Sequence, residues 1–431
     1  MSWPKEKLAA VCRIEKGNTG INKAIPGDYP MVVTSEARKS HNEYQFDEDA
    51  VIIPLVSSTG HGHKSLKRIH FQQGKFALGS ILCAIIPKDK TVISAEYLYR
   101  FLDLNKENEL VARMKGMANV TLPMKEIAQI EIPIPPLEQQ VEFTKKYNQL
   151  ENNSESISYE FTHQLDLLKK LRQQILQDAV QGRLVPQDAS DEPASMLLER
   201  IKAEKEQLVR EKKIKKEKPL PAIKPEEIPF EIPESWVWCR LEGIGLVNPR
   251  NYISDALDVS FIPMNLISAI YGRHPESLQK KWQEIKNGFT HFANNDVAIA
   301  KITPCFENSK SCVFKNLLNG FGAGTTELYV FRPHPENLSP EYIYIILKTK
   351  KFLVNGERIM RGVAGQQRVP PEYFRELLIP LPPLCEQHRI VAKVGQLMTL
   401  CDELEHSLKQ NQTYTRELLQ VALKEALEPK K

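Results

Sequence analysis

Two long stretches of the chain place apolar residues at alternating spacings of three and four positions, a pattern typical of helices that pack as a coiled coil. Prolines are absent between Pro136 and Pro186, and again between Pro383 and Pro429. A helix of 40 residues spans about 60 Å, whereas a module of 130 residues is only about 30 Å wide. This favours helix packed on helix, although an amphipathic helix packed on its own module is the alternative. The seam residues that we expect to meet a partner helix or subunit are Leu150, Ile157, Phe161, Leu168, Leu171 and Ile175, followed by Leu397, Leu404, Leu408 and Leu418.

Gln164 and Asn411 occupy matching positions in these two expected seams. A polar residue at such a position fixes the register of two helices at some cost in stability. Simple tolerance of a polar residue near a solvated stretch explains the same observation equally well.

Shorter apolar runs bounded by turn residues predict two β-rich modules. Ala50–Val56 and Ile81–Ile86 lie in the first half of the chain, and Val297–Ala300 and Leu328–Phe331 lie in the second. Helical candidates follow at residues 95–105 and 340–355. The pattern predicts α+β modules with mixed or antiparallel sheets.

The chain is an internal repeat. Ile132–Leu137 (IPIPPL) recurs as Ile379–Leu384 (IPLPPL), 247 positions later, and the similarity continues through the long helical stretches. Weaker similarity joins Ser94–Tyr99 with Ser339–Tyr344, and Ser2-Trp3 with Ser235-Trp236. We therefore expect two copies of one plan, related by a pseudo-two-fold axis. The expected parts are a first globular module (1–131), a hinge and first long helix (132–184), an exposed charged connector (185–233), a second module (234–378), and a hinge and second long helix (379–431).

Composition narrows the class of protein. Of the 431 residues, 42% are hydrophobic and 26% are charged, with a formal net charge of +4, which is ordinary for globular proteins and compatible with a nucleic-acid partner. The sequence contains no window of about 18 apolar residues, so it predicts no membrane-spanning helix. The seven cysteines are scattered, which argues against a disulfide framework and a zinc site. We expect a cytoplasmic protein that binds no metal.

Charge is distributed unevenly along the modules. No Asp or Glu occurs between Ala50 and Lys88, where His61, His63, Lys64, Lys67 and Arg68 cluster around glycines. A second basic window runs from Lys348 to Arg368 and contains Gln366 and Gln367, residue types that can contact base edges. A basic solvated surface is the alternative for either window. Catalytic motifs such as a P-loop or a nucleophile elbow are missing, which argues against an enzyme.

With this repeat and these hinges, the sequence resembles the specificity subunits of type I restriction–modification systems. The resemblance rests on two variable modules, each followed by I-P-x-P-P-L and a long helix, with Glu138-Gln139 and Glu386-Gln387 after the two hinges. Asp296–Asn308 and Ile214–Pro221 also resemble segments of that family.

The resemblance implies a subunit without catalytic activity or a cofactor of its own, in which two target-recognition domains are separated by two long antiparallel coiled-coil helices. Each domain would read one half of a bipartite target in double-stranded DNA. The chain would bind two methyltransferase (modification) subunits, which use S-adenosylmethionine, and restriction motor-nuclease subunits, which use ATP and Mg²⁺. The expected DNA contacts are His61, His63, Lys64, Lys67 and Arg68 in the first module, and Lys301, Asn308, Lys310, Arg361, Gln366, Gln367 and Arg368 in the second.

Two other functions remain open at the level of sequence. One is a coiled-coil adaptor that binds only protein, which the paired basic windows argue against. The other is a single-chain DNA methyltransferase or nuclease, which the missing cofactor loop argues against.

Overall fold

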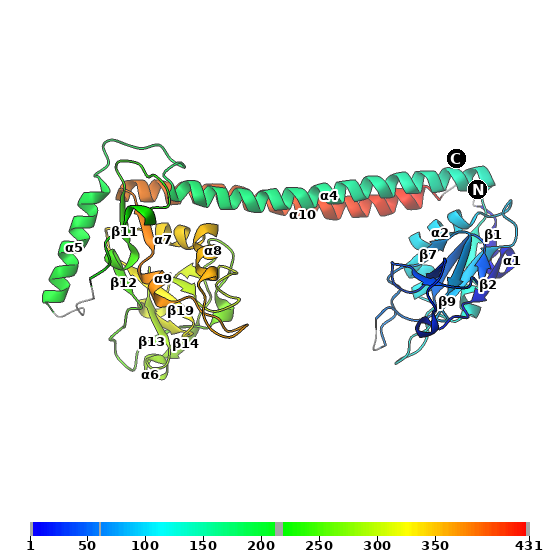
Figure 1. Cartoon of the computed structure of the whole chain (residues 1–431), viewed down its shortest axis with the longest axis horizontal. Helices are drawn as coiled ribbons and strands as arrows, with labels where there is room; N and C mark the ends of the chain where they lie inside the picture. The colour runs from blue at the N-terminus through cyan, green and yellow to red at the C-terminus, as the bar shows by residue number, and fades with distance from the viewer. Residues whose placement is uncertain (1–2, 60–61, 212–218, 428–431) are drawn as a thin grey trace. The chain divides into compact units, whose positions relative to one another are not determined.

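The computed structural model describes residues 3–59, 62–211 and 219–427. The chain divides into two compact units, Met1–Thr162 with Lys409–Lys431, and His163–Leu408. Each unit contains one β-rich module together with segments of both long helices (Figure 1). The predicted α+β class with mixed sheets is confirmed, and the boundaries expected for the five parts of the chain stay a prediction.

The first unit contains two four-stranded sheets. One has the order β2-β9-β6-β7 and is antiparallel throughout, and the other has the order β4-β3-β8-β5 with β3 and β8 parallel. The strands are β2 (Cys12–Lys16), β3 (Tyr29–Val32), β4 (Lys39–His41), β5 (Phe46–Asp47), β6 (Ala50–Pro54), β7 (His70–Gln72), β8 (Lys75–Leu78) and β9 (Leu82–Pro87). Helix α2 (Ala95–Leu104) packs on β6 and β7.

The second unit repeats this topology strand for strand. Its sheets have the orders β12-β19-β16-β17 and β14-β13-β18-β15, and β13 runs parallel to β18 as β3 does to β8. The strands are β12 (Gly245–Val247), β13 (Asp258–Ile262), β14 (Leu278–Lys281), β15 (Thr290–Ala293), β16 (Val297–Ala300), β17 (Ser311–Val313), β18 (Phe321–Gly324) and β19 (Leu328–Pro333). Helix α7 (Pro340–Leu347) takes the place of α2 and packs on β16 and β17, followed by α8 (Lys350–Arg358).

The central strands are apolar on both faces because each face meets a different core. Along β6, Val51 and Ile53 belong to the core beneath α2, whereas Ala50 and Ile52 belong to the core shared with the second sheet. Successive side chains of a strand point to opposite faces. An uninterrupted apolar run is therefore the pattern expected of a strand that is covered on both sides.

A short ribbon and a buried glutamine join each module to its long helix. The ribbons pair β1 (Lys5–Lys7) with β10 (Glu131–Pro133), and β11 (Val237–Arg240) with β20 (Leu378–Leu381). Gln140 and Gln387 are fully buried near the starts of α4 (Leu137–Val180) and α10 (Leu384–Glu425). Each accepts a hydrogen bond at 2.9 Å from the backbone N–H of the serine that caps the packed helix, Ser94 or Ser339. The same geometry thus joins module and helix twice.

The amide nitrogens of the two glutamines complete this junction. Gln140 donates to the carbonyls of Val92 and Pro135 at 2.8 and 2.9 Å, and Gln387 donates to Pro382 at 3.0 Å. These carbonyls belong to the loop before the cap and to the proline-rich hinge. The glutamine side chain therefore fixes the angle at which the helix leaves the module.

The long helices run antiparallel, as predicted. In the second unit, Arg172 of α4 pairs with Asp402 and Glu405 of α10 at 2.6 and 3.1 Å. In the first unit, Leu150 near the start of α4 shares an apolar cluster with Leu419 and Leu423 near the end of α10.

The expected seam residues divide between the packed face of the two helices and their exposed surface. Leu168, Ile175 and Leu408 are buried, Phe161 is half-buried, and Leu150 and Leu397 are partly buried at the edges of the apolar clusters. Ile157, Leu171, Leu404 and Leu418 are instead 42%, 48%, 50% and 69% exposed. The row that packs beside Leu168 and Leu408 is shifted by one residue, to Arg172 and Ala179 in α4 and to Met398, Glu405 and Gln412 in α10.

The apolar stripe on each helix is wider than one seam, because Leu165, Leu168 and Leu171 lie on adjacent rows. The helices pack along one edge of the stripe, and the row that contains Leu171 stays exposed. Asn411 is accordingly exposed and Gln164 half-buried, so Asn411 does not set the register from a buried position.

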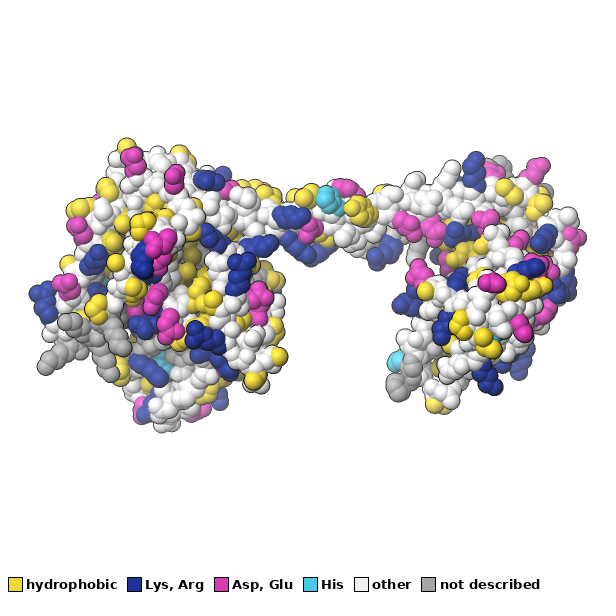
Figure 2. Space-filling view, in the orientation of Figure 1, with side chains coloured by type: hydrophobic (Ala, Val, Ile, Leu, Met, Phe, Trp, Pro, Cys, Tyr) yellow, Lys and Arg dark blue, Asp and Glu magenta, His cyan; other side chains and the backbone are white. Residues whose placement is uncertain are grey.

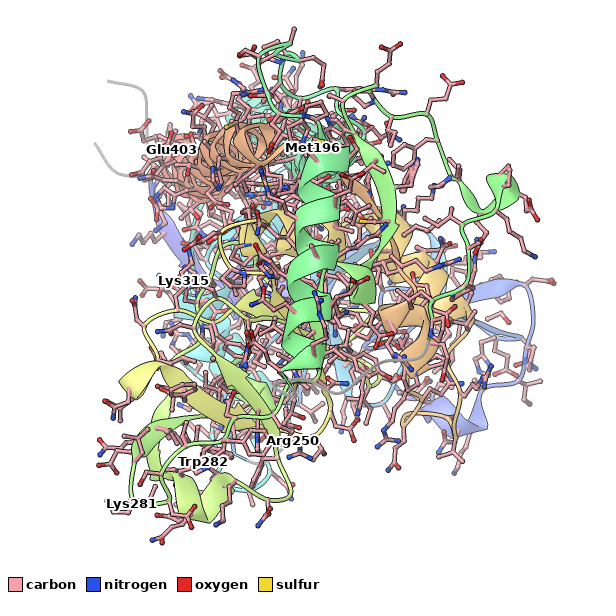
Figure 3. All side chains as sticks on the ribbon, turned by 90° about the vertical axis from the view of Figure 1, so that its left-hand side faces the viewer. Met196, Arg250, Lys281, Trp282, Lys315 and Glu403 are labelled. Atoms are coloured by element: carbon pink, nitrogen blue, oxygen red, sulfur yellow. The ribbon has the colours of Figure 1, made fainter. Side chains whose placement is uncertain are left out.

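The connector differs from the exposed segment that the sequence predicts. Helix α5 (Ala194–Arg210) buries Ala194, Leu197 and Ile201 in the core of the second unit, together with Trp236 and Leu241. Lys205 also donates to the carbonyl of Glu242 at 2.5 Å. Met196, on the opposite side of α5, is 50% exposed (Figure 3). The lysine-rich segment 212–218 lies outside the described residues.

Replacing Gln140 by alanine should lower the free energy of unfolding by about 2–3 kcal/mol, because three backbone groups lose the hydrogen bonds that they make with this fully buried side chain. Gln387→Ala should have a similar effect in the second unit. The matched control is Gln149→Ala, which changes an exposed residue of the same helix and should stay within about 0.5 kcal/mol of the wild type. Chemical denaturation followed by circular dichroism measures all three, and equal effects of Gln140→Ala and Gln149→Ala would contradict the assigned role.

Candidate nucleic-acid interface

The basic loop of the first module follows strand β6 and is closed by hydrogen bonds of two serines. Ser57 Oγ donates to the carbonyl of His63 at 2.6 Å, and Ser58 Oγ accepts from the backbone N–H of Lys67 at 2.8 Å. The side chains of His63, Lys64 and Lys67 are exposed. His61 lies outside the described residues. Three of the five expected residues are therefore exposed to solvent, on described parts of the loop that these hydrogen bonds hold.

Arg68 is less available than its neighbours because its guanidinium lies 2.8 Å from the Glu36 carboxylate. Behind it, Arg38 donates to Gln72 at 3.0 Å and contacts His70 Nδ1 at 3.2 Å. Burial and the two nearby arginines lower the pKa of His70 to about 4. This histidine is therefore neutral at pH 7 and adds no positive charge to the loop.

Three of the expected cations in the second module have partners within the protein. Arg368 pairs with Glu327, whose carboxylate accepts from Nε and Nη2 at 2.9 and 2.7 Å and raises the pKa of the guanidinium. Lys310 donates to the carbonyl of Met264 at 3.1 Å. Lys301 lies over the ring of Tyr329, and burial lowers its pKa.

The remaining expected residues of this module, Asn308, Arg361, Gln366 and Gln367, lie on two segments that the backbone joins. The backbone N–H of Thr303 donates to the carbonyl of Gln367 at 2.9 Å, and Arg361 and Arg368 exchange a pair of hydrogen bonds. Asn308, Arg361 and Gln366 are exposed, and Gln367 is half-buried. The structure therefore places this loop at the end of strand β16, as the loop of the first module follows β6.

A buried lysine organises the segment around Asn308. Lys348, at the C-terminus of α7, is 4% exposed and donates to the carbonyls of Ala269 and Ser309 at 2.8 and 2.6 Å. Burial lowers its pKa to about 7. The sequence places this lysine in a basic window, but the structure uses it to hold two loops together.

The modules share a second similarity, a pair of hairpin loops, that is not among the expectations from the sequence. Lys115–Thr121 and Arg361–Arg368 form equivalent hairpin loops, each closed by a bridge between its end residues. The signal is a similarity over five residues, three of them identical, between Met114–Ala118 (MKGMA) and Met360–Ala364 (MRGVA), 246 positions apart. The match is too short to stand out before the two folds are compared.

The loop Asn248–Tyr252 takes part in a network of hydrogen bonds and ion pairs within the second unit. Asn251 is buried and donates to the carbonyl of Phe292, and Arg332 bridges Asn251 and the buried carboxylate of Asp296. Arg250 contacts His291, whose ring lies 4.6 Å from that of Trp282. Arg250 and Trp282 are labelled in Figure 3.

The visible face of each unit carries Lys and Arg side chains interspersed with Asp and Glu, not a continuous basic surface (Figure 2). Many of the charges are paired within the protein, which explains why the basic windows of the sequence do not become broad basic patches. Among the described residues, no group of three or more His, Cys, Asp or Glu could hold a metal ion. The described helices include none that is both long and apolar enough to cross a membrane.

Residues 2–165 and 233–412 match the family model of the type I restriction modification DNA specificity domain. The chain belongs to this family. Each matched segment contains one module and more than half of the long helix that follows it. The family domain therefore occurs once in each copy of the internal repeat.

Two specificity subunits of Escherichia coli match one part of the chain closely. The type I restriction enzyme EcoAI specificity subunit is 54% identical over 239 residues, which are 55% of this chain and 41% of that protein. The EcoEI specificity subunit is 52% identical over 240 residues, 55% of this chain and 40% of the relative. The chain thus spans about two fifths of the length of each of these relatives. The EcoDI specificity subunit is 24% identical over 439 residues, which cover 99% of this chain and 88% of that subunit.

Two solved structures share the fold over almost the entire chain. One is a chain of a type I R-M system, from work on its complex assembly and conformational transition, with a TM-score of 0.58, 15% identity, and coverage of 99% of this chain and 98% of that chain. The other is the HsdS subunit from Thermoanaerobacter tengcongensis, with a TM-score of 0.55, 16% identity, and coverage of 99% and 96%. At these identities they show the fold alone.

The lowered pKa of Lys348 predicts how the stability of this specificity domain depends on pH. Between about pH 7, the pKa of the folded state, and 10.5, its ordinary value, the unfolded chain binds a proton that the folded chain lacks. The free energy of unfolding contributed by Lys348 should therefore rise with pH across this window. Lys348→Met should abolish the rise, and Lys350→Met, which changes an exposed neighbour, should retain it. Melting temperatures at about pH 7, 8 and 9 measure the difference; parallel curves for wild type and Lys348→Met would contradict the assignment.

Proposed function

We propose that this chain is the DNA-recognition subunit of a type I restriction–modification complex and that it reads a bipartite target in double-stranded DNA. The observation that carries the proposal is the duplicated module, in which corresponding loops follow corresponding strands, β6 and β16. Two similar readers on one chain suit a target with two half-sites, as two-fold symmetric proteins suit paired half-sites. In this proposal residues 1–131 and 234–378 are the recognition domains.

The candidate DNA contacts differ in how much support the structure gives them. His63, Lys64 and Lys67 in the first module, and Asn308, Arg361 and Gln366 in the second, are exposed on loops. Arg68, Lys310 and Arg368 have protein partners, and a contact to DNA would have to compete with Glu36, the Met264 carbonyl and Glu327. We therefore assign the first group to direct contacts and the second group to holding the loops.

The long helices support a proposal for the protein partners. In the second unit, Leu167, Leu171, Leu400 and Leu404 are exposed by 47–60%. In the first unit, the exposed residues Ile157, Tyr414 and Leu418 are the repeat counterparts of Leu404, Leu167 and Leu171. We call these sets the second-unit and first-unit apolar patches. Figure 2 shows hydrophobic side chains on the surface of the long helices.

Two patches of the same kind, related by an internal repeat, suit two identical partners, because equivalent surfaces bind equivalent subunits. The chemistry of an N6-adenine methyltransferase requires S-adenosylmethionine. We assign that cofactor to two modification subunits that occupy the patches, and ATP and Mg²⁺ to restriction subunits. No catalytic role is proposed for this chain. A protein-only adaptor is the second candidate, which the exposed apolar patches favour when taken by themselves.

The helices also support a role in spacing the half-sites. Helices α4 and α10 have 44 and 42 residues, which at 1.5 Å per residue corresponds to about 65 Å. A helix is a stiff spacer, so its length would limit the separation between the two reading modules.

Long-read sequencing of host DNA should detect N6-methyladenine at one split motif when this gene is present and not when it is deleted. Complementation with a chain that lacks one heptad from each helix (residues 158–164 and 411–417) should keep both half-sites. It should shorten the spacer by about three base pairs, because seven residues span about 10.5 Å and each base pair about 3.4 Å. An unchanged spacer would rule out the spacing role, and methylation that ignores the gene would contradict the proposed function.

Leu404→Lys should remove one of the two methyltransferase subunits from the purified complex, because a charge replaces part of the second-unit apolar patch. Ile157→Lys, its repeat counterpart, should remove the other, and the double variant should lose both. Ile157 and Leu404 are 42% and 50% exposed, so the fold should be retained, with a loss of about 1 kcal/mol or less. Glu403→Lys, which changes an exposed neighbour on α10, is the matched control. Native mass spectrometry counts the subunits; full occupancy in the double variant would move the docking surface elsewhere.

A further inference from the structure

Each module presents one apolar side chain at the tip of its hairpin loop. In the first unit, Lys115 and Thr121 exchange two backbone hydrogen bonds of 2.8 Å, and Met117 at the tip is 94% exposed. In the second unit, Arg361 and Arg368 exchange bonds of 3.0 and 2.8 Å, and the tip residue Val363 is 71% exposed.

The same backbone geometry holds both tips. Gly116 and Gly362, immediately before the tip residues, have φ angles of 115° and 127°, which L side chains rarely adopt. A Cβ on Gly116 would lie 2.3 Å from the carbonyl oxygen of Asn119, and one on Gly362 would lie 3.0 Å from that of Gln366. The glycine thus allows the loop to close tightly behind an apolar residue in both copies.

Both hairpins are attached to the sheet by backbone hydrogen bonds on two sides. In the first unit, Ser57 donates to Val120 at 3.0 Å and Leu122 donates to Leu55 at 2.9 Å. In the second unit, Thr303 donates to Gln367 and Val369 donates to Lys301, both at 2.9 Å. The tips therefore stand on rigid supports next to the ends of β6 and β16.

A single exposed apolar side chain is common on protein surfaces and needs no explanation. Here the same feature occurs at equivalent places in the two modules. Exposure of an apolar side chain such as Met or Val to water is unfavourable, and this free energy is recovered when a ligand covers the side chain. Two such tips indicate a ligand that both modules share.

The surroundings of the tips favour DNA over protein as that ligand. The carbonyl of Met117 lies against Gly62, where an added Cβ would approach it to 2.3 Å, so this tip adjoins the loop that carries His63 and Lys64. Val363 lies between Arg361 and Gln366 on its own loop. Duplex DNA offers phosphates to such cations and uncharged base edges and faces to an apolar residue, and apolar side chains of this size contact thymine methyl groups or enter base steps.

We propose that Met117 and Val363 are matched apolar contacts to bases, one in each half-site. This inference rests on the proposed function and adds to it two residues that carry no charge and no hydrogen-bonding group. The cations of the loops hold the phosphates, and the tip contributes to the choice of base.

The experiment uses the complex of the full chain with its methyltransferase partner and fluorescence anisotropy with three duplexes: the split target, and the target with either half-site scrambled. Met117→Ser should weaken binding to the intact target by about tenfold, the scale expected when burial of one apolar side chain is lost. On the duplex in which the half-site of the first module is scrambled, Met117→Ser and the wild type should bind equally well. Val363→Ser and the wild type should bind equally well on the duplex in which the half-site of the second module is scrambled. The salt dependence should stay the same, because no charge is removed.

Four further variants serve as controls. Met117→Leu and Val363→Ile keep an apolar tip and should retain most of the affinity. Ile25→Ser and Ile270→Ser remove exposed apolar residues elsewhere in the two units, where the exposed fractions are 58% and 53%, and should change nothing.

Wild-type affinity and half-site preference in both serine variants would overturn the inference while leaving the proposed function intact. Loss of a methyltransferase subunit with unchanged half-site preference would assign the tips to a protein contact and would also overturn it. A wild-type complex that does not distinguish the three duplexes would overturn the proposed function itself, and the inference with it.

Discussion

The arrangement of the chain depends on one buried glutamine near the start of each long helix, because its side chain joins the helix to the module that precedes it. Gln140 and Gln387 join the cap of a module helix to the proline-rich hinge through side-chain hydrogen bonds to backbone groups. A buried backbone group without a partner costs free energy, so the glutamine cannot be exchanged for an apolar residue without disturbing the angle between helix and module. The loops that follow β6 and β16 stand on the sheet that the module helix covers, so each module carries its loops as part of the body that the glutamine joins to the long helix.

Duplication explains the remaining organisation. One plan, used twice, gives two sheet pairs, two hairpin loops and two exposed apolar rows on the helices, and identical solutions recur at the glycines before the hairpin tips. In the function that we propose, such a chain would offer the same type of surface to two copies of a partner and the same type of loop to two halves of a target. The modules differ in the charged residues of the loops, whereas the backbone hydrogen bonds that support the loops are repeated.

The basic windows are where the structure differs most from the expectation, because several of their cations have partners within the protein. Lys348 became a buried tie between two loops, Arg368 became the partner of Glu327, and Arg68 the partner of Glu36. None of these partners is near in sequence, so a charge count along the chain cannot separate a free cation from a paired one. The uncharged tips, Met117 and Val363, carry no signal in such a count at all.

The sequence by itself determined the repeat, the α+β class, the long helices and the family resemblance, because periodicity and the duplicated hinge motif are local properties of the chain; the antiparallel direction of the helices was an implication of the resemblance. It also determined one row of the helix seam, the row that contains Leu168 and Leu408. Only the tertiary structure decided which edge of the wider apolar stripe is buried, since Leu171 and Leu404 are as apolar as their packed neighbours and differ only in how the helices are rotated against each other. The same reason applies to the loops: exposure and pairing depend on residues 30 or more positions away, such as Glu36 beside Arg68 and Glu327 beside Arg368, and distance in space is settled only when the chain folds.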